Sequence, residues 1–272
     1  MKKTIGIIGG GNMGEALIKG LYEVKKSVVH VCETNPERVE FLKSGYKIIY
    51  EQDINSLVAK VDIIILAVKP QEMESVLGQI KTTEGKLFIS IAAGLTIKYF
   101  EDKLGAKPRV IRAMPNLPAL NLEGITGYCA GQFADERDKG NANLILETLG
   151  GGPGSVILFP DESQMDAVTA VSGSGPAYVF YFVEEWIKAA TTLGLSEKDA
   201  RILVCETLIG SAGLLKKERY AEFKTLEILR AKVTSKGGTT QAAMDVLSKG
   251  KLEQLMKDTL LAAKKRAKEL AK

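Results

Sequence analysis

The stretch IGIIGGGNMG, residues 5–14, determines the fold expected for the first half of the chain. Its apolar run Ile5–Ile8 predicts a strand, and the residues that follow have the pattern of a helix. Gly9, Gly11 and Gly14 fit G-x-G-x-x-G in the strand, turn and helix context that this motif requires. The first glycine permits a tight turn, the second lets a pyrophosphate approach the backbone, and the third lets helix and strand pack closely. The stretch therefore predicts a dinucleotide site at a helix N-terminus.

The first 160 residues alternate short β-branched runs with amphipathic stretches. Strands are expected at residues 4–8, 28–32, 47–49, 62–68, 87–92, 109–113, 124–130 and 155–159. Helices are expected at residues 12–22, 36–43, 71–80 and 135–149. This alternation predicts a Rossmann-type α/β fold, with a doubly wound, mostly parallel sheet and helices on its faces. The short connections between the last strands favour an antiparallel or mixed edge.

After Pro160 the pattern becomes helical throughout. No strand is expected there, and apolar residues recur at helical spacing, as at Tyr178, Phe182 and Trp186. Three glycines predict helix ends, at Gly194, Gly213 and Gly250. The expected organisation is an NAD(P)-binding domain over residues 1–161 and an all-helical domain over residues 162–272.

Composition and charge exclude several classes of function. The chain has 37 Lys and Arg against 33 Asp and Glu, and the net charge of +4 equals that of residues 264–272 alone. The remainder is balanced, so neither a nucleic-acid footprint nor a membrane-surface patch is expected. The longest uncharged stretch, residues 167–183, contains three helix-interrupting residues and predicts no membrane span. No signal peptide is expected at the start.

Cysteine and histidine usage narrows the chemistry further. The three cysteines, Cys32, Cys129 and Cys205, lie far apart and lack metal-ligand spacing, so no bound metal is expected. A reduced, cytoplasmic protein is expected. The single histidine, His30, lies in a β-branched run that predicts a buried strand. A histidine base is therefore not expected, and the chemistry has to proceed without imidazole.

The residues expected to contact the dinucleotide gather where parallel strands end. Glu33, which follows the second strand, is placed to accept hydrogen bonds from the ribose hydroxyls of NADH, while Asn35 and Arg38 could hold the 2′-phosphate of NADPH. A solvated turn is the alternative for Glu33, and an ordinary surface position is the alternative for Lys69. The cofactor stays open between NADH and NADPH. The expected cofactor-binding residues are Ile8, Gly9, Gly10, Gly11, Asn12, Met13, Gly14, Glu33, Asn35, Arg38, Ala67, Val68, Lys69, Pro70, Ile91, Ala92 and Ala93.

Three further segments are candidates for binding a substrate. Two prolines around Asn116 predict a rigid polar loop, although a plain connection explains it as well. Residues 172–176, with Ser174, open a helix expected at residues 177–193, and a capped helix start explains that serine too. Residues 233–240 place two glycines and three hydroxyl side chains before another helix, which predicts an anion site or ordinary capping.

Taken together, these segments resemble pyrroline-5-carboxylate reductases. The matching segments agree in order and spacing over essentially the whole chain, and VTSKGGTT at residues 233–240 is the specific one. Leu117 and Lys236 depart from the family pattern, Glu33 is unusual for members that prefer NADPH, and residues 216–224 are longer than usual. No role is transferred to that last stretch.

The resemblance implies hydride transfer from NADPH or NADH to the C=N carbon of 1-pyrroline-5-carboxylate, giving L-proline. It implies that backbone amides of Gly237, Gly238 and Thr239 hold the carboxylate, with Ser235 as a further partner, and that Thr240 contacts the ring nitrogen as the catalytic residue. It also implies a homodimer built by the helical domains, often assembled into a decamer, with an active site shared between subunits.

Two other classes of protein share parts of this pattern. A β-hydroxyacid dehydrogenase has the same two-domain plan and needs a catalytic lysine, for which Lys188 is the candidate. A non-catalytic NAD(P)-sensing protein would also keep the glycine motif.

Overall fold

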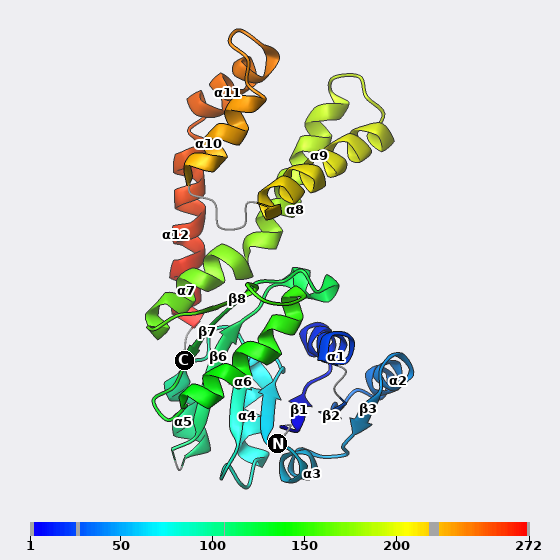
Figure 1. The fold of residues 1–272 in the computed structure, drawn as a ribbon, viewed down its shortest axis with the longest axis vertical. Helices are drawn as coiled ribbons and strands as arrows, with labels where there is room; N and C mark the ends of the chain where they lie inside the picture. The colour runs from blue at the N-terminus through cyan, green and yellow to red at the C-terminus, as the bar shows by residue number, and fades with distance from the viewer. Residues whose placement is uncertain (1–2, 26–27, 106, 218–222, 271–272) are drawn as a thin grey trace. The chain divides into compact units, whose positions relative to one another are not determined.

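A computed structural model describes residues 3–25, 28–105, 107–217 and 223–270 (Figure 1). It confirms the α/β sheet followed by a helical half. The sheet has eight strands in the order β3-β2-β1-β4-β5-β6-β7-β8. Their bounds are β1 Ile5–Ile8, β2 Val29–Cys32, β3 Ile48–Tyr50, β4 Ile63–Leu66, β5 Leu87–Ser90, β6 Arg109–Met114, β7 Thr126–Ala130 and β8 Val156–Leu158. Each strand expected from the sequence is present within a few residues of its predicted bounds.

The predicted mixed edge is also confirmed. Strands β1 to β6 pair in parallel, β7 runs antiparallel to β6, and β8 is parallel to β7. A parallel crossover needs a dozen or more residues, usually a helix. Between β6 and β7 the chain has only the 3-10 helix η1, Leu117–Asn121, and therefore returns antiparallel.

The sheet half contains two helices that the sequence patterns did not indicate. The expected helices are present as α1 Asn12–Lys25, α2 Pro36–Gly45, α4 Pro70–Gln79 and α6 Glu136–Leu146, the last followed by η2 Glu147–Gly150. The missed helices are α3 Ile54–Lys60 and α5 Ile97–Leu104, too short to show a clear period. Both carry a start signal, because the side chains of Asp53 and Thr96 cap the amides of Ser56 and Tyr99.

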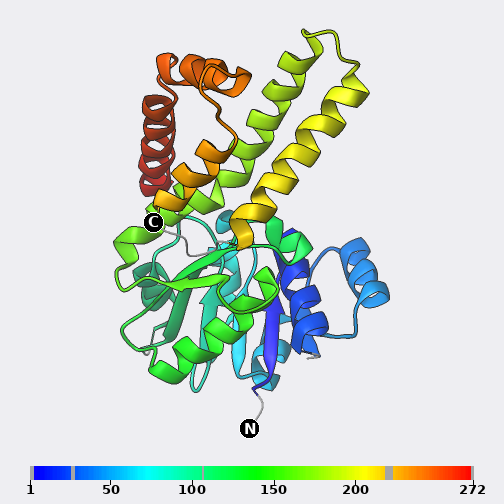
Figure 2. The same cartoon turned by 45° about the horizontal axis from the view of Figure 1, so that its top comes forward.

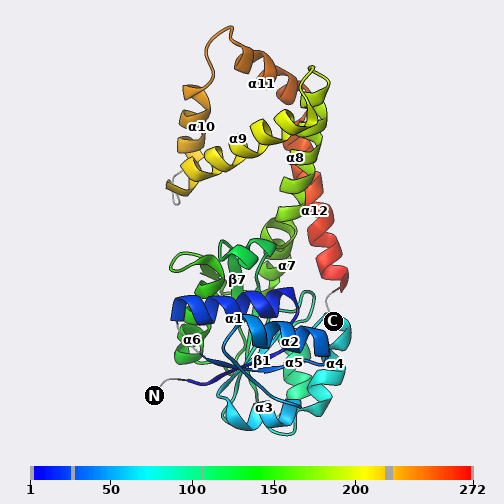
Figure 3. The same cartoon turned by 90° about the vertical axis from the view of Figure 1, so that its right-hand side faces the viewer.

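Two hydrophobic cores form the layers of this half. Alternate strand residues point to opposite faces of the sheet, so Ile7 and Ile8 belong to different cores. One face is covered by α1, α2 and α6, through side chains such as Leu17, Leu42 and Leu146. The other is covered by α3, α4 and α5 (Figure 3). Helices on both faces leave the two ends of the strands as the places for polar side chains.

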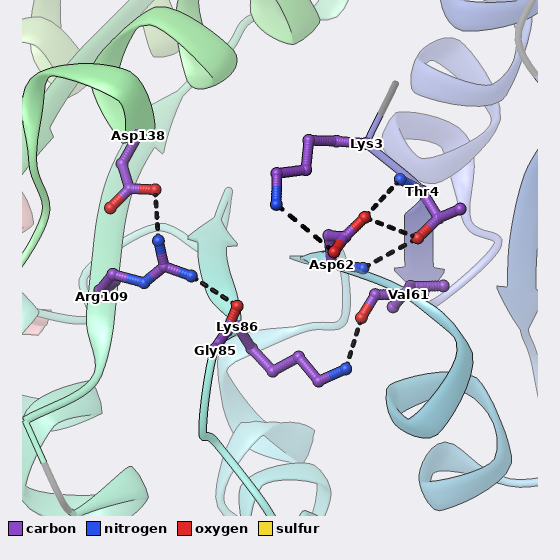
Figure 4. A network of polar contacts seen from close by, with 8 residues as sticks. All are labelled: Lys3, Thr4, Val61, Asp62, Gly85, Lys86, Arg109 and Asp138. Carbon is purple, nitrogen blue, oxygen red and sulfur yellow. Dashed lines mark hydrogen bonds and ion pairs between the residues drawn. The ribbon is translucent and has the colours of Figure 1, made fainter. Parts of the chain in front are cut away.

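At the amino ends of the strands, polar contacts join neighbouring connections (Figure 4). The Asp62 carboxylate accepts hydrogen bonds from the Thr4 amide at 2.9 Å and the Thr4 hydroxyl at 3.0 Å. Lys86 Nζ donates to the Val61 carbonyl at 2.6 Å, and Arg109 donates to Asp138 at 2.9 Å. These contacts lie at the amino ends of the strands, whereas the glycine loop lies at the carboxyl end of β1.

The remainder of the chain is helical over its described residues. Its elements are η3 Glu162–Gln164, α7 Met165–Val168, the π-helical turn η4 Thr169–Gly173, α8 Gly175–Thr191, α9 Glu197–Lys217, α10 Phe223–Lys232, α11 Thr239–Lys249 and α12 Leu252–Leu270. Helices α8 and α9 run in opposite directions (Figure 2). Part of the unusual stretch 216–224, residues 218–222, lies outside the described residues.

One sequence prediction about helix ends is corrected. Gly213 lies inside α9 and ends no helix; this helix of 21 residues also contains Gly210, and each glycine costs a helix only about 1 kcal/mol. Gly194 and Gly250 do follow helices, as predicted. Residues 172–176 lead from the π-helical turn into α8, which begins at Gly175, so the helix start predicted there is present.

The chain forms two compact units, Met1–Pro176 with Leu261–Lys272, and Ala177–Leu260. Residues 162–176 lie in the first unit because Met165 and Val168 belong to a core of the sheet. The end of α12 packs there too, since a side chain at Gly94 would meet the Leu270 carbonyl at 3.1 Å. A domain boundary after residue 161 stays a prediction. None of the helices in the described part of the chain has the length and apolarity of a membrane span.

Candidate functional site

A cavity of about 710 Å³ lies at the carboxyl ends of β1, β2 and β4. It brings together eight of the residues predicted to bind a cofactor: Ile8, Gly9, Gly11, Glu33, Asn35, Ala67, Val68 and Lys69. Lining residues that the sequence did not indicate come from the end of β2 and the turn after it, and from α3, α4 and the segments before them: Cys32, Thr34, Gln52, Asp53, Ile54, Gln71, Glu72, Ser75, Val76 and Gln79. The helix cap at Asp53 was the available signal for one side of this cavity.

The glycine loop fits a bound pyrophosphate. Gly9 has φ +99°, and a side chain there would meet the Ala67 carbonyl oxygen at 2.7 Å. A side chain at Gly14 would collide with the Gly9 carbonyl, so helix and strand meet only because this residue is glycine. A side chain at Gly11 would meet nothing within 4 Å, which leaves its backbone open to the cavity. The three glycines therefore have the geometry that the motif predicts.

The other predicted cofactor-binding residues of the glycine loop and of the strand ends do not line the cavity. Gly10 is buried beneath Leu42 and does not line the cavity, and Asn12 and Met13 begin α1, with Met13 packed on the core. Pro70 starts α4. Ile91, Ala92 and Ala93 follow β5 and lie outside the cavity.

Glu33 is held by three backbone amides. Its Oε2 accepts a hydrogen bond from the Gly10 amide at 2.6 Å. Its Oε1 accepts from the amides of Thr34 at 2.7 Å and Asn35 at 2.8 Å. The carboxylate is half-buried and faces the cavity beside the glycine loop. Two of its three partners are amides of its own turn, so its role as a ribose ligand stays a prediction.

Arg38 is engaged away from the cavity. Its Nε donates to the Gly10 carbonyl at 2.5 Å, and its Nη2 donates to Glu15. The other oxygen of Glu15 accepts the Tyr46 hydroxyl at 3.0 Å. Burial and this bond raise the pKa of Tyr46 to about 12. Asn35 caps α2 by accepting from the amides of Glu37 and Arg38, at 3.0 and 3.2 Å.

The connection between β6 and β7 is held by a hydrogen bond between two of its own residues. Asn116 Oδ1 accepts a hydrogen bond from the Ile125 amide at 2.9 Å, which fixes the short connection to β7. Met114 packs against the π-helical turn, where a side chain at Gly173 would collide with its Cε at 2.5 Å. Ser174 follows that turn and its amide donates to the Thr169 carbonyl at 2.8 Å.

Residues 235–240 form a compact turn at the start of α11. Gly237 has φ +72°, and the Gly238 amide donates to the Ser235 carbonyl at 3.0 Å. Gly238 occupies the N-cap of α11 without a side-chain capping bond. Thr239 and Thr240 form the first turn of the helix, with Thr239 exposed and Thr240 half-buried. The amides at this helix start are therefore not capped by a side chain of the turn itself.

The chemistry of imidazole and metals is limited in the described residues. His30 Nδ1 lies 2.8 Å from Glu51, in the buried interior between strand and helix, and not in the cavity. No group of three or more metal-ligating side chains occurs in the described ranges. Burial raises the pKa of the Cys129 thiol to about 12, so this residue is no nucleophile.

The fold and the glycine loop define an NAD(P)-dependent oxidoreductase with a helical second half. Residues 4–94 match the family described as NADP oxidoreductase, coenzyme F420-dependent, and residues 162–270 match the pyrroline-5-carboxylate reductase dimerisation family.

Relatives extend this match to the full chain. Pyrroline-5-carboxylate reductase of Mycobacterium leprae is 36% identical, over 98% of this chain and 96% of the relative. Pyrroline-5-carboxylate reductase 2 of Bacillus subtilis is 34% identical, over 98% and 95%. A solved pyrroline-5-carboxylate reductase from Coxiella burnetii superposes with a TM-score of 0.90 at 34% identity, covering both chains completely. The chain belongs to the pyrroline-5-carboxylate reductase family.

Proposed function

We propose that this chain reduces 1-pyrroline-5-carboxylate to L-proline, the last step of proline biosynthesis, with NADPH or NADH. Full-length relatives of that name support the proposal, and so does the dinucleotide cavity at the carboxyl edge of the sheet. The single observation that carries the substrate assignment is the turn of residues 235–240, which starts α11 without a side-chain cap. Such a helix start binds a carboxylate through backbone amides.

The reaction transfers two electrons and needs little acid or base catalysis from the protein. A reduced nicotinamide, when bound, supplies the hydride. The hydride forms a C–H bond at the imine carbon, whose π electron pair passes to a nitrogen that is already protonated. Proline and the oxidised dinucleotide result. A cyclic imine gains its proton near neutral pH, and this accounts for a site without histidine.

The protein's own residues then act by positioning. The amides of Gly237, Gly238 and Thr239 hold the substrate carboxylate, and Ser235 lies beside Gly238 as a further donor. The Thr240 hydroxyl accepts a hydrogen bond from the protonated ring nitrogen. Holding two reactants in a reactive geometry supplies roughly 7–11 kcal/mol in well-oriented systems. Asn116 and Ser174 stay in the proposal as substrate-binding residues, and Asn116 would use its Nδ2 because Oδ1 holds Ile125.

The cofactor end is carried by the glycine loop, the Glu33 turn and residues 67–70. Ile91, Ala92 and Ala93 are proposed for the nicotinamide end, where small side chains let a ring lie against the backbone. A solved relative from Plasmodium falciparum, 30% identical with a TM-score of 0.83, has NADP bound. That complex supports the placement of a dinucleotide in this family.

The family match of residues 162–270, which is described as a dimerisation family, supports a dimer. We propose a homodimer through these residues, assembled further into a decamer, in the cytoplasm. Apolar side chains on α8 support the dimer, because Phe180, Tyr181 and Phe182 are 59%, 66% and 54% exposed. No nucleic acid or membrane is part of the proposal.

The experiment is an absorbance assay at 340 nm with purified protein, NADH or NADPH, and 1-pyrroline-5-carboxylate. Oxidation of the nucleotide with formation of proline is expected. The matched control uses β-hydroxyacids with NAD or NADP, the substrates of the rival dehydrogenase class. Lys188 argues against that class, since its ammonium is bound by Glu184 at 2.7 Å and Glu185 at 2.9 Å, which raises its pKa. Nucleotide binding without turnover of either substrate would indicate a sensor.

A further inference from the structure

The turn between β2 and α2 contains the groups that would meet the adenosine ribose, since ribose hydroxyls lie at the end of the second strand in this fold. A 2′-phosphate differs from a 2′-hydroxyl by its negative charge and by its need for several donors. The state of the donors in this turn therefore decides which of the two nucleotides it accepts.

Four backbone donors of this turn are committed to internal acceptors. The amides of Thr34 and Asn35 both donate to Glu33 Oε1. The amides of Glu37 and Arg38, at the start of α2, donate to the Asn35 side chain. A 2′-phosphate could use these four amides only by displacing their present partners.

The cationic donor of the turn is committed as well. The Arg38 guanidinium binds Glu15 on α1, lies 4.7 Å from the Phe41 ring and donates to the Gly10 carbonyl at 2.5 Å. Glu33 holds the amide of the same Gly10 at 2.6 Å. The two side chains thus hold the Gly10 backbone through its N–H and its C=O, which belong to the two peptide groups that flank this residue. Arg38 orients the glycine loop through Nε and Nη2 and does not line the cavity.

The charges that line the cavity oppose a second anion. Glu33, Asp53 and Glu72 all line it, and the Ser56 hydrogen bonds hold the pKa of Asp53 below its ordinary value. Lys69 is the cation among the described lining residues. It follows β4, which is separated from β2 by β1, and two strand spacings amount to about 9.6 Å.

We propose that the adenosine end of this cavity selects NADH over NADPH, with Glu33 as the residue that determines the preference and Arg38 as a positioning residue for Gly10. The proposal rests on the proposed nicotinamide-dependent function and adds the choice of nucleotide. The Glu33 carboxylate has about four acceptor sites, of which loop amides use three, so it can accept a ribose hydroxyl while it keeps those amides. A 2′-phosphate removes one ribose hydroxyl and adds repulsion.

The test measures the dissociation constants of NADH and NADPH by fluorescence titration of the full-length protein without substrate. NADH should bind at least about tenfold more tightly, as expected for a hydrogen bond to a charged group. In Glu33→Gln this preference should fall by about tenfold or more. The matched control is Glu37→Gln, an exposed glutamate four residues on that removes the same charge outside the cavity, and the preference should be retained.

Arg38→Met separates positioning from phosphate binding. The dissociation constants of NADH and NADPH should both rise by similar factors, because the Gly10 carbonyl loses its hydrogen bond from Arg38. A selective loss of NADPH binding in Arg38→Met or Lys69→Met would overturn the proposal, and so would equal or tighter binding of NADPH by the wild type. The wild-type ratio needs no variant to fold. Tight NADH binding without pyrroline-5-carboxylate turnover would support this inference and contradict the proposed function, and NADPH-preferring turnover would do the reverse.

Discussion

The Glu162 carboxylate, just after the last strand, lies 2.8 Å from the buried guanidinium of Arg112 on β6. The same Glu162 oxygen accepts the Ile97 amide at the start of α5, also at 2.8 Å. One side chain therefore ties the beginning of the helical half to a strand and a helix of the sheet. Because Arg112 is only 5% exposed, its charge depends on this partner and on Asp166 at 3.7 Å.

Replacing Glu162 by glutamine should lower the free energy of unfolding by about 3 kcal/mol, since it leaves a buried cation without its main partner. Urea denaturation of the full-length protein measures the change. The matched control is Glu136→Gln, which removes an 87% exposed partner of Lys139 and should cost less than about 1 kcal/mol. Equal small losses in both variants would show that Asp166 alone compensates Arg112.

Glu51 should make folding stability depend on acid. Burial alone would raise the pKa of its carboxyl, but hydrogen bonds from Lys60 and His30 outweigh burial and hold the pKa below the ordinary value. The folded pKa is thus lower than the unfolded one. The stabilisation is present above about pH 4.3, the value of an unpaired glutamate, and is lost as the pH falls through the folded pKa. Urea unfolding at several pH values should therefore show the advantage of wild type over Glu51→Gln shrinking with acid; a constant difference would contradict it.

The apolar face of α8 should control assembly. Phe182→Glu places a charge on an exposed aromatic side chain, 5.7 Å from the Trp186 ring, and should convert the dimer to monomer. Light scattering after size-exclusion chromatography measures the mass. Lys198→Glu, an exposed change on α9, is the control and should leave the mass unchanged. A dimer that survives Phe182→Glu would place the interface elsewhere.

Thr240→Val removes one hydroxyl and retains the shape of the side chain. If Thr240 binds the ring nitrogen, kcat/KM for pyrroline-5-carboxylate should fall about 10–150-fold, the rate equivalent of a hydrogen bond of roughly 1.5–3 kcal/mol. Nucleotide affinity, measured by the same fluorescence titration, should not change. An unaltered kcat/KM would show that the nitrogen faces another group. A loss beyond about 10³-fold in a folded variant would instead indicate an obligatory proton relay.

Most strands and helices of the sheet half could be predicted from local sequence patterns. The apolar runs that become β1 to β8 and the amphipathic stretches of α1, α2, α4 and α6 are visible because their periods differ, near two for strands and 3.6 for helices. The helices α3 and α5 were not predicted because their 7 and 8 residues span about two turns, too few to show a helical period. Gly213 misled for the opposite reason, since α9 has 21 residues and a helix of that length tolerates both Gly210 and Gly213.

The sequence by itself determined the type and order of the elements, the glycine loop and the placement of Glu33 after the second strand, because these depend on neighbours along the chain. Only the tertiary structure decided which groups around Glu33 are free to bind. Arg38 meets a partner 23 residues away in Glu15, and Glu15 meets Tyr46 across 31 residues. Such pairings form only when α1, α2 and the glycine loop pack together, so no local pattern could show that the one arginine suited to a phosphate is already bound.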